Sequence, residues 1–519
     1  MELLQIVLFL LLCAVALGWV ARHFNFPYPI ALVIGGGALS FVPNLPHFPF
    51  DPQFILVLVL PPILYQAALL TSWRDFKANI RPIGLLAIGL VIVTTLAVGA
   101  ALKMLIPECP WGAAFVLGAI VSPPDAVAAT AILSRLNIPR RVVVVLEGES
   151  LVNDASGLVI YKFAVAAVLT GAFSLVDASV QFVGVAAGGI LAGVLLGRLF
   201  VAVHRRLGDT FIEVLMTLAV PYVAYIFAES VHVSGVLAVV AAGMVRGRYA
   251  PEIVSAEMRI IARPVWNMLV FLLNSLIFML IGIHLSEVVA RLSGYSAAQL
   301  CLYGVFISVV AITVRFAWVY PATYLPRAMS SALREREPAP AEGEVFIMSW
   351  CGMRGIVSLA AALALPVVLA NGEPFPQRDL IIFLTFVVIA VTLVVQGLSL
   401  PPLIRRLKVG ADWSLHDEHQ RARIALGAAA LAAIDELAQR ERMSAELAAR
   451  VRAEFADKIE RAFADGPAVE GDSELARRLR QAAIQAERRE LIRIWRESQI
   501  SDDILHHIEE DLDYQESHI

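Results

Sequence analysis

The stretch Glu147–Asp154, with the sequence EGESLVND, carries three carboxylates at the head of an apolar run over residues 155–170. A charged carboxylate at the centre of a membrane helix is unfavourable by at least about 2.5 kcal/mol, so such residues are rare there. Three of them at the entrance to a hydrophobic segment therefore indicate a functional site. Ser150 and Asp154 are four residues apart, which places them on one face of a helix.

The composition around this stretch is that of a polytopic membrane protein. Of 519 residues, 59% are hydrophobic and 17% are charged, whereas soluble domains average about 25% charged residues. A membrane span needs about 20 mostly apolar residues, and about thirteen segments qualify. They lie at 2–21, 28–42, 53–70, 82–105, 111–133, 142–170, 178–203, 209–228, 232–246, 264–285, 298–325, 344–370 and 379–404.

The loops between these spans differ strongly in basic residues. One set of alternate loops contains nineteen Lys and Arg residues, and the other set contains only Lys103, Arg291 and Arg378. Basic loops stay in the cytoplasm, so we expect the N-terminus outside and the C-terminus inside. The first span lacks a basic segment before it, since Glu2 occupies that place, and we do not expect a cleaved signal.

The character of the chain changes near Lys408. Residues 411–519 are rich in Ala, Glu, Arg and Leu at helical spacing, with breaks at Gly466-Pro467 and Gly471-Asp472. We therefore predict two domains, a transmembrane domain at 1–408 and a helical cytosolic tail at 409–519. The sequence contains no P-loop, dinucleotide fingerprint or zinc pattern, so we expect no cofactor, no enzymatic activity and no nucleic-acid partner.

A second acid lies in an apolar segment that cannot stay helical. Two prolines precede Asp125 in the sequence Ser-Pro-Pro-Asp-Ala, and each removes a backbone donor. Broken backbone at membrane depth is tolerated where it lines a cavity, as in the cation sites of secondary transporters. A simple proline kink is the alternative, but a kink does not need the acid. Asp125, Asp154 and the Ser150 hydroxyl could supply three oxygens to Na⁺, and a carboxylate can carry a proton when the cation is absent.

Two arginines lie deep in other apolar spans. Arg315 has no acid near it in sequence, and a buried arginine needs a partner from another helix. We pair it with Glu149 and expect a structural contact that does not bind the ion. Arg354, in the sequence Gly-Met-Arg-Gly, should neutralise half-helix carbonyls opposite the Asp125 break. The two broken spans occupy corresponding places in the two halves, as an inverted repeat would.

The remaining intramembrane charges have a simpler interpretation. Glu213, Glu229 and Arg198 lie near predicted span ends, and their side chains can extend to the membrane interface. Lys162 lies deeper, but its long side chain could do the same. Glu147 is left without a partner near the cytoplasmic entrance.

These motifs resemble those of the monovalent cation:proton antiporters of the sodium/proton exchanger type. The resemblance covers roughly residues 1–408 and is carried by EGESLVND, the Pro-Pro-Asp and Gly-Met-Arg-Gly elements, Arg315 and the sequence LPPILY from Leu60. It implies an all-α fold of about thirteen spans with inverted repeats and two crossed broken helices. It also implies a homodimer in which a core moves like an elevator against a dimerisation domain.

The resemblance further assigns roles to residues. It implies that Asp154 is the exchanging carboxylate, that Glu149 and Arg315 are the family's ion pair, and that Asn153 marks the electroneutral branch, because electrogenic relatives have a second Asp there. Many relatives have Thr where this chain has Pro124, so here only the Pro124 backbone carbonyl could serve as a ligand. Several relatives have Glu where this chain has Gln66. Both departures leave the choice between Na⁺ and K⁺ open.

The sequence therefore predicts electroneutral exchange of a monovalent cation, Na⁺ first, for H⁺ in pH and sodium homeostasis. K⁺/H⁺ exchange or mixed Na⁺, K⁺ and Li⁺ exchange is the alternative. An ion channel or sensor could use the same acids, but it would not couple cation to proton movement. An intramembrane aspartyl protease would need a Gly-x-Gly-Asp element, which the sequence lacks. We expect the bilayer to be a bacterial plasma membrane.

Overall fold

A computed structural model of the chain describes most of the apolar region. The described residues are 2–23, 28–40, 52–125, 129–130, 133, 136, 138–170, 175–254, 256–292, 294–369, 372–407 and 409, with 449 and 453. By its internal contacts the chain divides into two units, Met1–Ala411 and Asp412–Ile519. The tail predicted at 409–519 lies outside the described residues apart from three positions, so its helices stay a prediction.

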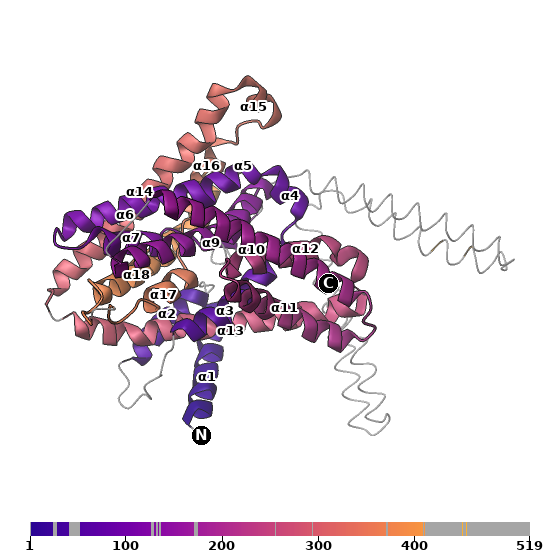
Figure 1. The fold of residues 1–519 in the computed structure, drawn as a ribbon, viewed down its shortest axis with the longest axis horizontal. Coiled ribbons are helices and arrows are strands. Elements are labelled where there is room, and N and C mark those ends of the chain that lie inside the picture. Colours follow the sequence, from indigo (N-terminus) through magenta and orange to yellow (C-terminus); the bar gives the residue numbers. More distant parts are fainter. Residues whose placement is uncertain are drawn as a thin grey trace. The chain divides into compact units, whose positions relative to one another are not determined.

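The described residues of the first unit are almost entirely helical (Figure 1). The first half contains α1 (Glu2–His23), α2 (Tyr28–Leu39), α3 (Pro52–Leu70), α4 (Trp73–Ala78), α5 (Ile80–Gly84), η1 (Leu85–Leu90), α6 (Val91–Leu105), α7 (Trp111–Val121), α9 (Arg140–Thr170) and α10 (Leu175–His204). The second half contains α11 (Thr210–Ser230), α12 (Gly235–Ile253), α13 (Ala256–Arg291), α14 (Ala297–Met329), α15 (Ser331–Arg336), α16 (Glu342–Trp350), α17 (Ile356–Leu363), α18 (Arg378–Val391), η2 (Thr392–Gln396) and α19 (Gly397–Leu407).

Seven of the described helical segments are long and apolar enough to cross a membrane. They are Ile80–Leu105, Arg140–Thr170, Ser179–His204, Thr210–Ser230, Ile260–Leu280, Ala297–Met329 and Arg378–Leu407. Shorter apolar helices occur at Leu8–Ala21, Ile30–Leu39, Val57–Leu70 and Trp111–Val121. The chain is therefore a multi-pass membrane protein with an all-α fold, and the count of thirteen spans stays a prediction.

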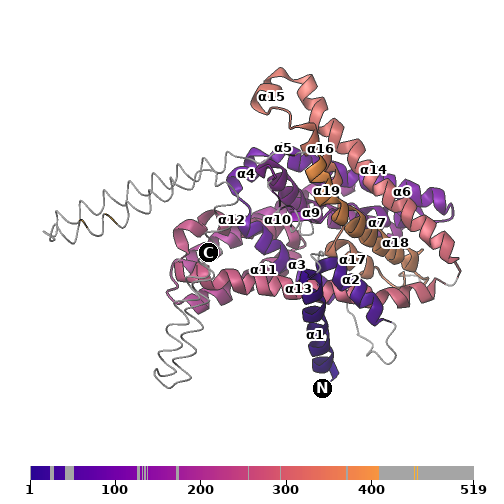
Figure 2. The same cartoon turned by 180° about the vertical axis from the view of Figure 1, so that it is seen from behind.

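Two groups of helices flank α9. Figure 1 shows α11 and α12 on one side of it and α6, α7 and α18 on the other. In the first group α10 packs along α12, and below α9 in Figure 1 α2 packs along α13. Glycines permit this close approach, because a Cβ at Gly193 would overlap Ala238 and one at Gly282 would overlap the backbone of α2. In the second group α14 runs beside α6 and α18 (Figure 2).

Three of the predicted spans differ from the observed helices. In the segment predicted at 111–133, α7 ends at Val121 and residues 122–125 are not helical, as the Pro-Pro-Asp element predicts, while residues 129, 130 and 133 are helical again. The segment predicted at 344–370 is interrupted at 351–355, as the Gly-Met-Arg-Gly element predicts, and its second helix ends at Leu363, before the predicted end. Beyond Leu363 the backbone turns and Val368 forms an isolated bridge with Pro374. Conversely, α13 begins at Ala256, eight residues before the predicted start at 264. Hydropathy measures burial and not backbone conformation, so it misplaces such ends.

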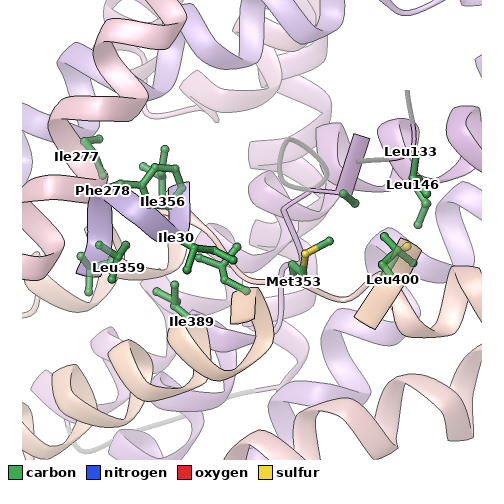
Figure 3. Close-up of a cluster of buried hydrophobic side chains, with 14 of the residues drawn as sticks. Ile30, Leu133, Leu146, Ile277, Phe278, Met353, Ile356, Leu359, Ile389 and Leu400 are labelled. Carbon is green, nitrogen blue, oxygen red and sulfur yellow. The ribbon is translucent and has the colours of Figure 1, made fainter. Parts of the chain in front are cut away.

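A cluster of buried apolar side chains surrounds one of these interruptions. Met353 comes from the non-helical segment 351–355, and Ile356 and Leu359 follow it on α17 (Figure 3). Ile30 of α2 and Phe278 of α13 belong to the same cluster. The irregular backbone is thus covered by protein, as irregular backbone at membrane depth must be.

Candidate functional site

Two non-helical segments, 122–125 and 351–355, touch each other through their backbones. The segment 122–125 follows α7 because Pro123 and Pro124 cannot donate the hydrogen bonds that would continue the helix. The Asp125 amide instead donates to the Met353 carbonyl, with N and O 2.7 Å apart. The two broken helices predicted from the sequence therefore meet, and the contact fixes the position of Asp125.

Each break has a buried arginine at the carbonyl end of its first half-helix. Arg354, only 1% exposed, donates from Nε to the Val121 carbonyl at 2.8 Å, at the end of α7. Arg315 donates from Nε and Nη2 to the Met348 carbonyl at 3.1 and 3.0 Å, in the last turn of α16. The last carbonyls of a helix lack intrahelical partners and carry partial negative charge. The role expected for Arg354 is therefore also performed by Arg315.

Gly355 determines how closely the Asp125 side chain approaches the second break. A Cβ built at Gly355 would overlap the Asp125 carboxylate. Any larger residue at this position must displace that carboxylate or the backbone beneath it. Gly355, the last residue of the Gly-Met-Arg-Gly element, is therefore required for the observed position of the Asp125 side chain.

A cavity of about 210 Å³ lies beside the crossing of the two breaks. Its wall is formed by α3, the 122–125 segment, α9, α13 and the beginning of α17. Asp125, Ser150 and Asp154 all line it, so the structure brings three of the predicted ligands to one space. Asp154 is 7% exposed. The cavity extends along α9 to Glu147 and along α3 to Thr71.

Asn153 lies beside the cavity and forms a hydrogen bond to the non-helical segment 122–125. Its side chain is fully buried, and Nδ2 donates to the Pro124 carbonyl at 3.0 Å. The Pro124 carbonyl, predicted as a cation ligand, is thus already engaged, and only its second lone pair is left for a cation. A carboxylate at position 153 could not donate this hydrogen bond unless it were protonated.

Glu149 and Arg315 form a bidentate ion pair. Nη1 and Nη2 of Arg315 donate to Oε1 and Oε2 of Glu149 at 2.5 and 2.8 Å, and both residues are 1% exposed. Paired planar groups are the strongest form of such contacts. Glu149 does not line the cavity that Asp154 lines, and the two acids of one motif therefore have different surroundings.

Several contacts of the site involve residues that the sequence did not single out. Ser156 donates to the Ala87 carbonyl at 2.5 Å, where η1 interrupts the α-helical pattern. Thr392, in the second π-helical turn, accepts from the Arg354 amide at 3.1 Å. The available sequence signal was the presence of Ser and Thr inside apolar helices. Their hydroxyl groups can hydrogen-bond to backbone groups that lose their usual partner where a helix is irregular.

Charged residues near the ends of the predicted spans form ion pairs that the sequence analysis did not predict. Lys162 of α9 and Glu229 of α11 form an ion pair at 3.2 Å, although each was expected to extend separately to the membrane interface. Glu213, 8% exposed, lies 3.7 Å from His204. The interface expectation was wrong for Glu213, because helix packing encloses its carboxylate against α10.

The donor set of the cavity suits a hard monovalent cation. Asp125, Asp154 and Ser150 offer only oxygen ligands, as alkali and alkaline-earth cations prefer. Among the described residues no three His, Cys, Asp or Glu side chains gather as a transition-metal site would require. The arrangement can therefore exchange a cation and a proton at a carboxylate, because each neutralises the same charge.

Comparison with known proteins gives a family and a fold. Residues 7–406 match the family described as "Sodium/hydrogen exchanger, transmembrane". An uncharacterised Na(+)/H(+) exchanger of Mycobacterium tuberculosis strain H37Rv is 34% identical, over 98% of this chain and 95% of its own length. The sodium, potassium, lithium and rubidium/H(+) antiporter of Bacillus pumilus is 36% identical, over 82% of this chain and 65% of its own.

The fold is similar to that of a solved antiporter. The sodium proton antiporter MjNhaP1 of Methanocaldococcus jannaschii matches with a TM-score of 0.63 and 19% sequence identity. The match covers 78% of this chain and 99% of that structure. The helix arrangement described above is therefore that of a known transporter fold.

Proposed function

Because this chain belongs to the sodium/hydrogen exchanger family, which is a family of transporters, we propose that it exchanges Na⁺ for H⁺ at Asp154. The observation that carries this proposal is the shared cavity of Asp154, Asp125 and Ser150 beside two broken helices. In one form the carboxylates and the hydroxyl hold the cation, and in the other Asp154 holds a proton. Either occupant neutralises the same charge, and this competition couples the two fluxes.

We propose that each cycle is electroneutral. One carboxylate that releases H⁺ when it takes up Na⁺ moves one positive charge in each direction. Asn153 adds no second exchangeable proton, since a side-chain amide does not ionise near neutral pH; it donates instead to the Pro124 carbonyl. A second candidate is mixed exchange of Na⁺, K⁺ and Li⁺, which the similarity to the Bacillus pumilus antiporter favours. The Pro124 carbonyl, which already accepts a hydrogen bond from Asn153, is a weaker cation ligand and so favours a less selective site.

We expect reconstituted vesicles to decide substrate and coupling together. With a pH dye inside, addition of Na⁺, K⁺ or Li⁺ in turn should move protons, with Na⁺ the most effective. Clamping the membrane potential with a K⁺ ionophore at different K⁺ gradients should leave the Na⁺-driven rate unchanged. A rate that follows the potential would exclude electroneutral exchange, and cation current without proton movement would indicate a channel.

We further propose alternating access of the elevator kind, with the described conformation open to the cytoplasm. The cavity continues toward the end of α3, where an adjoining cleft is lined by Arg74, Lys77 and Arg248. Because basic loops favour the cytoplasm, we place that side there. The ion pair of Lys162 and Glu229 joins α9 to α11 on the other side of Asp154, eight residues or roughly 12 Å further along α9.

This arrangement predicts that tethering α9 to α11 stops transport. A Lys162→Cys/Glu229→Cys variant, with the exposed Cys301 replaced by Ser, should lose exchange when a short reducible reagent links the two thiols. Reduction should restore it, because the tether and not the substitutions blocks movement. Each single cysteine treated alike is the control. Full exchange in linked protein would contradict a sliding of α9 past α11.

The assembly and location follow the family expectation. We propose a homodimer in a bacterial plasma membrane, with the N-terminus outside and the C-terminus in the cytoplasm. The exposed apolar side chains of α1, such as Leu12 and Trp19 at 70% and 67%, fit a surface against lipid or a second copy. Physiologically, such exchange would serve pH and sodium homeostasis.

A further inference from the structure

Glu147 is a carboxylate in the cavity to which the exchange at Asp154 gives no role. It lines the same cavity as Ser150 and Asp154, three and seven residues further along α9. Positions i, i+3 and i+7 share one helix face, and seven residues span roughly 10 Å along the axis. The three polar side chains therefore form a line along the cavity wall, from the end near Arg140 to the crossing of the breaks.

Glu147 shares with Asp154, and not with the other carboxylates near it, the lack of a hydrogen-bond or ion-pair partner among the described residues. Glu149 is paired with Arg315, Asp75 with Arg140 at 2.6 Å, and Glu229 with Lys162. Within the described part of the chain, Glu147 makes neither a hydrogen bond nor an ion pair, and it is half-buried. A partly desolvated carboxylate is unfavourable without a counter-charge, and here the cavity offers space for a mobile one.

The basic residues at the cavity entrance suggest a role for the Glu147 carboxylate. The cleft that adjoins the cavity shares Leu70 and Thr71 with it, and three exposed basic residues, Arg74, Lys77 and Arg248, line that cleft without an acid among its lining residues. Such a cleft repels an entering cation. Glu147 is the first carboxylate on the cavity wall beyond this entrance, before Asp154 is reached.

We propose that Glu147 is a second cation-binding position, which takes up the monovalent cation inside the basic entrance and passes it along Ser150 to Asp154. The proposal rests on the proposed exchange at Asp154 but adds a step to it. Because the cation only pauses at Glu147, removal of its charge should weaken capture without preventing exchange at saturating cation.

The test is a comparison of KM and Vmax for Na⁺ in vesicles containing the full chain. We expect Glu147→Gln to raise the KM for Na⁺ by roughly tenfold, as loss of one close charge–charge contact implies, with Vmax within about twofold of wild type. Glu147→Asp, which keeps the charge, should restore most of the affinity. Glu342→Gln, at an exposed position at the start of α16 outside the cavity, is the matched control and should leave both constants unchanged.

The outcomes separate this proposal from the proposed function and from a structural role. An unchanged KM in Glu147→Gln, beside an active wild type, would overturn the second position alone. A wild type without cation-driven proton movement would instead refute the exchange itself. A lower melting temperature or misfolding of Glu147→Gln would also count against the proposal, because a residue without protein partners should not stabilise the fold.

Discussion

Asp154→Asn is expected to reduce cation-driven proton movement to the background of empty vesicles. The amide has nearly the shape of the carboxylate, but it neither binds a proton at working pH nor neutralises a cation. Because Asp154 is 7% exposed within a membrane span, losing its charge should not lower the melting temperature, since burial of an unpaired charge is unfavourable. The variant should therefore be folded and inactive.

Two measurements make this result decisive. Ligand binding to the folded state alone raises its stability, so Na⁺ should raise the melting temperature of wild type and not of Asp154→Asn. Asp379→Asn, at the partly exposed start of α18 and outside the cavity, removes an equal charge and should keep both exchange and the Na⁺ effect. Proton movement that survives in Asp154→Asn would refute the assignment of the exchanging carboxylate.

The second large effect is expected on stability, from the pair of Glu149 and Arg315. Removal of one partner leaves the other charge buried without compensation, which typically destabilises by about 3–5 kcal/mol. Arg315→Ala should be the more severe variant, because it also leaves the Met348 carbonyl without its two donors. The measurement is the melting temperature of purified protein, together with the exchange rate of the fraction that stays folded.

A double variant tests whether the effect belongs to the pair. Glu149→Gln/Arg315→Met removes both charges and should be less destabilised than the sum of the two single variants, since neither charge is stranded. Arg334→Ala, at an exposed position on α15, is the matched arginine control and should change the melting temperature little. Single variants as stable as wild type would contradict a structural role for the pair.

The sequence predicts much of the membrane architecture because the signals are local. Hydropathy over 20 residues identifies most spans, and two adjacent prolines predict the interruption before Asp125 without any knowledge of neighbours. Even so, the interruption at 351–355 ends a helix where hydropathy alone suggested a continuous span to 370. Glycine at 352 and 355 was a sign of the break, but the close approach of the Asp125 carboxylate, which requires glycine at 355, could not be read from the sequence.

The roles of polar residues were harder to predict, because they depend on distant partners. Glu149 and Arg315 are 166 residues apart, and their pairing was inferred because a buried arginine needs an acid and because the family resemblance implies it. The donation from Asn153 to the Pro124 carbonyl and the capping of α16 by Arg315 were not foreseen. Lys162 and Glu229 were separated in the prediction, although helix packing joins them.

The sequence by itself therefore determined that this is a polytopic helical membrane protein with interrupted helices and a few acids at membrane depth. The first property follows from the free energy of transferring side chains into lipid, and the second from the backbone donor that proline lacks. Both effects depend only on the residues of one segment, so the sequence is enough to predict them. The sequence also predicted the pair of Glu149 and Arg315, but only the tertiary structure placed Glu147 with Asp154 on the cavity wall and joined Asn153 to the Pro124 carbonyl. Glu147 and Asp154 lie on the face of α9 that lines the cavity, whereas Glu149 is enclosed with Arg315. The physical reason is that α16 packs against α9 and Arg315 reaches Glu149 from α14, so the two faces of one helix have different surroundings.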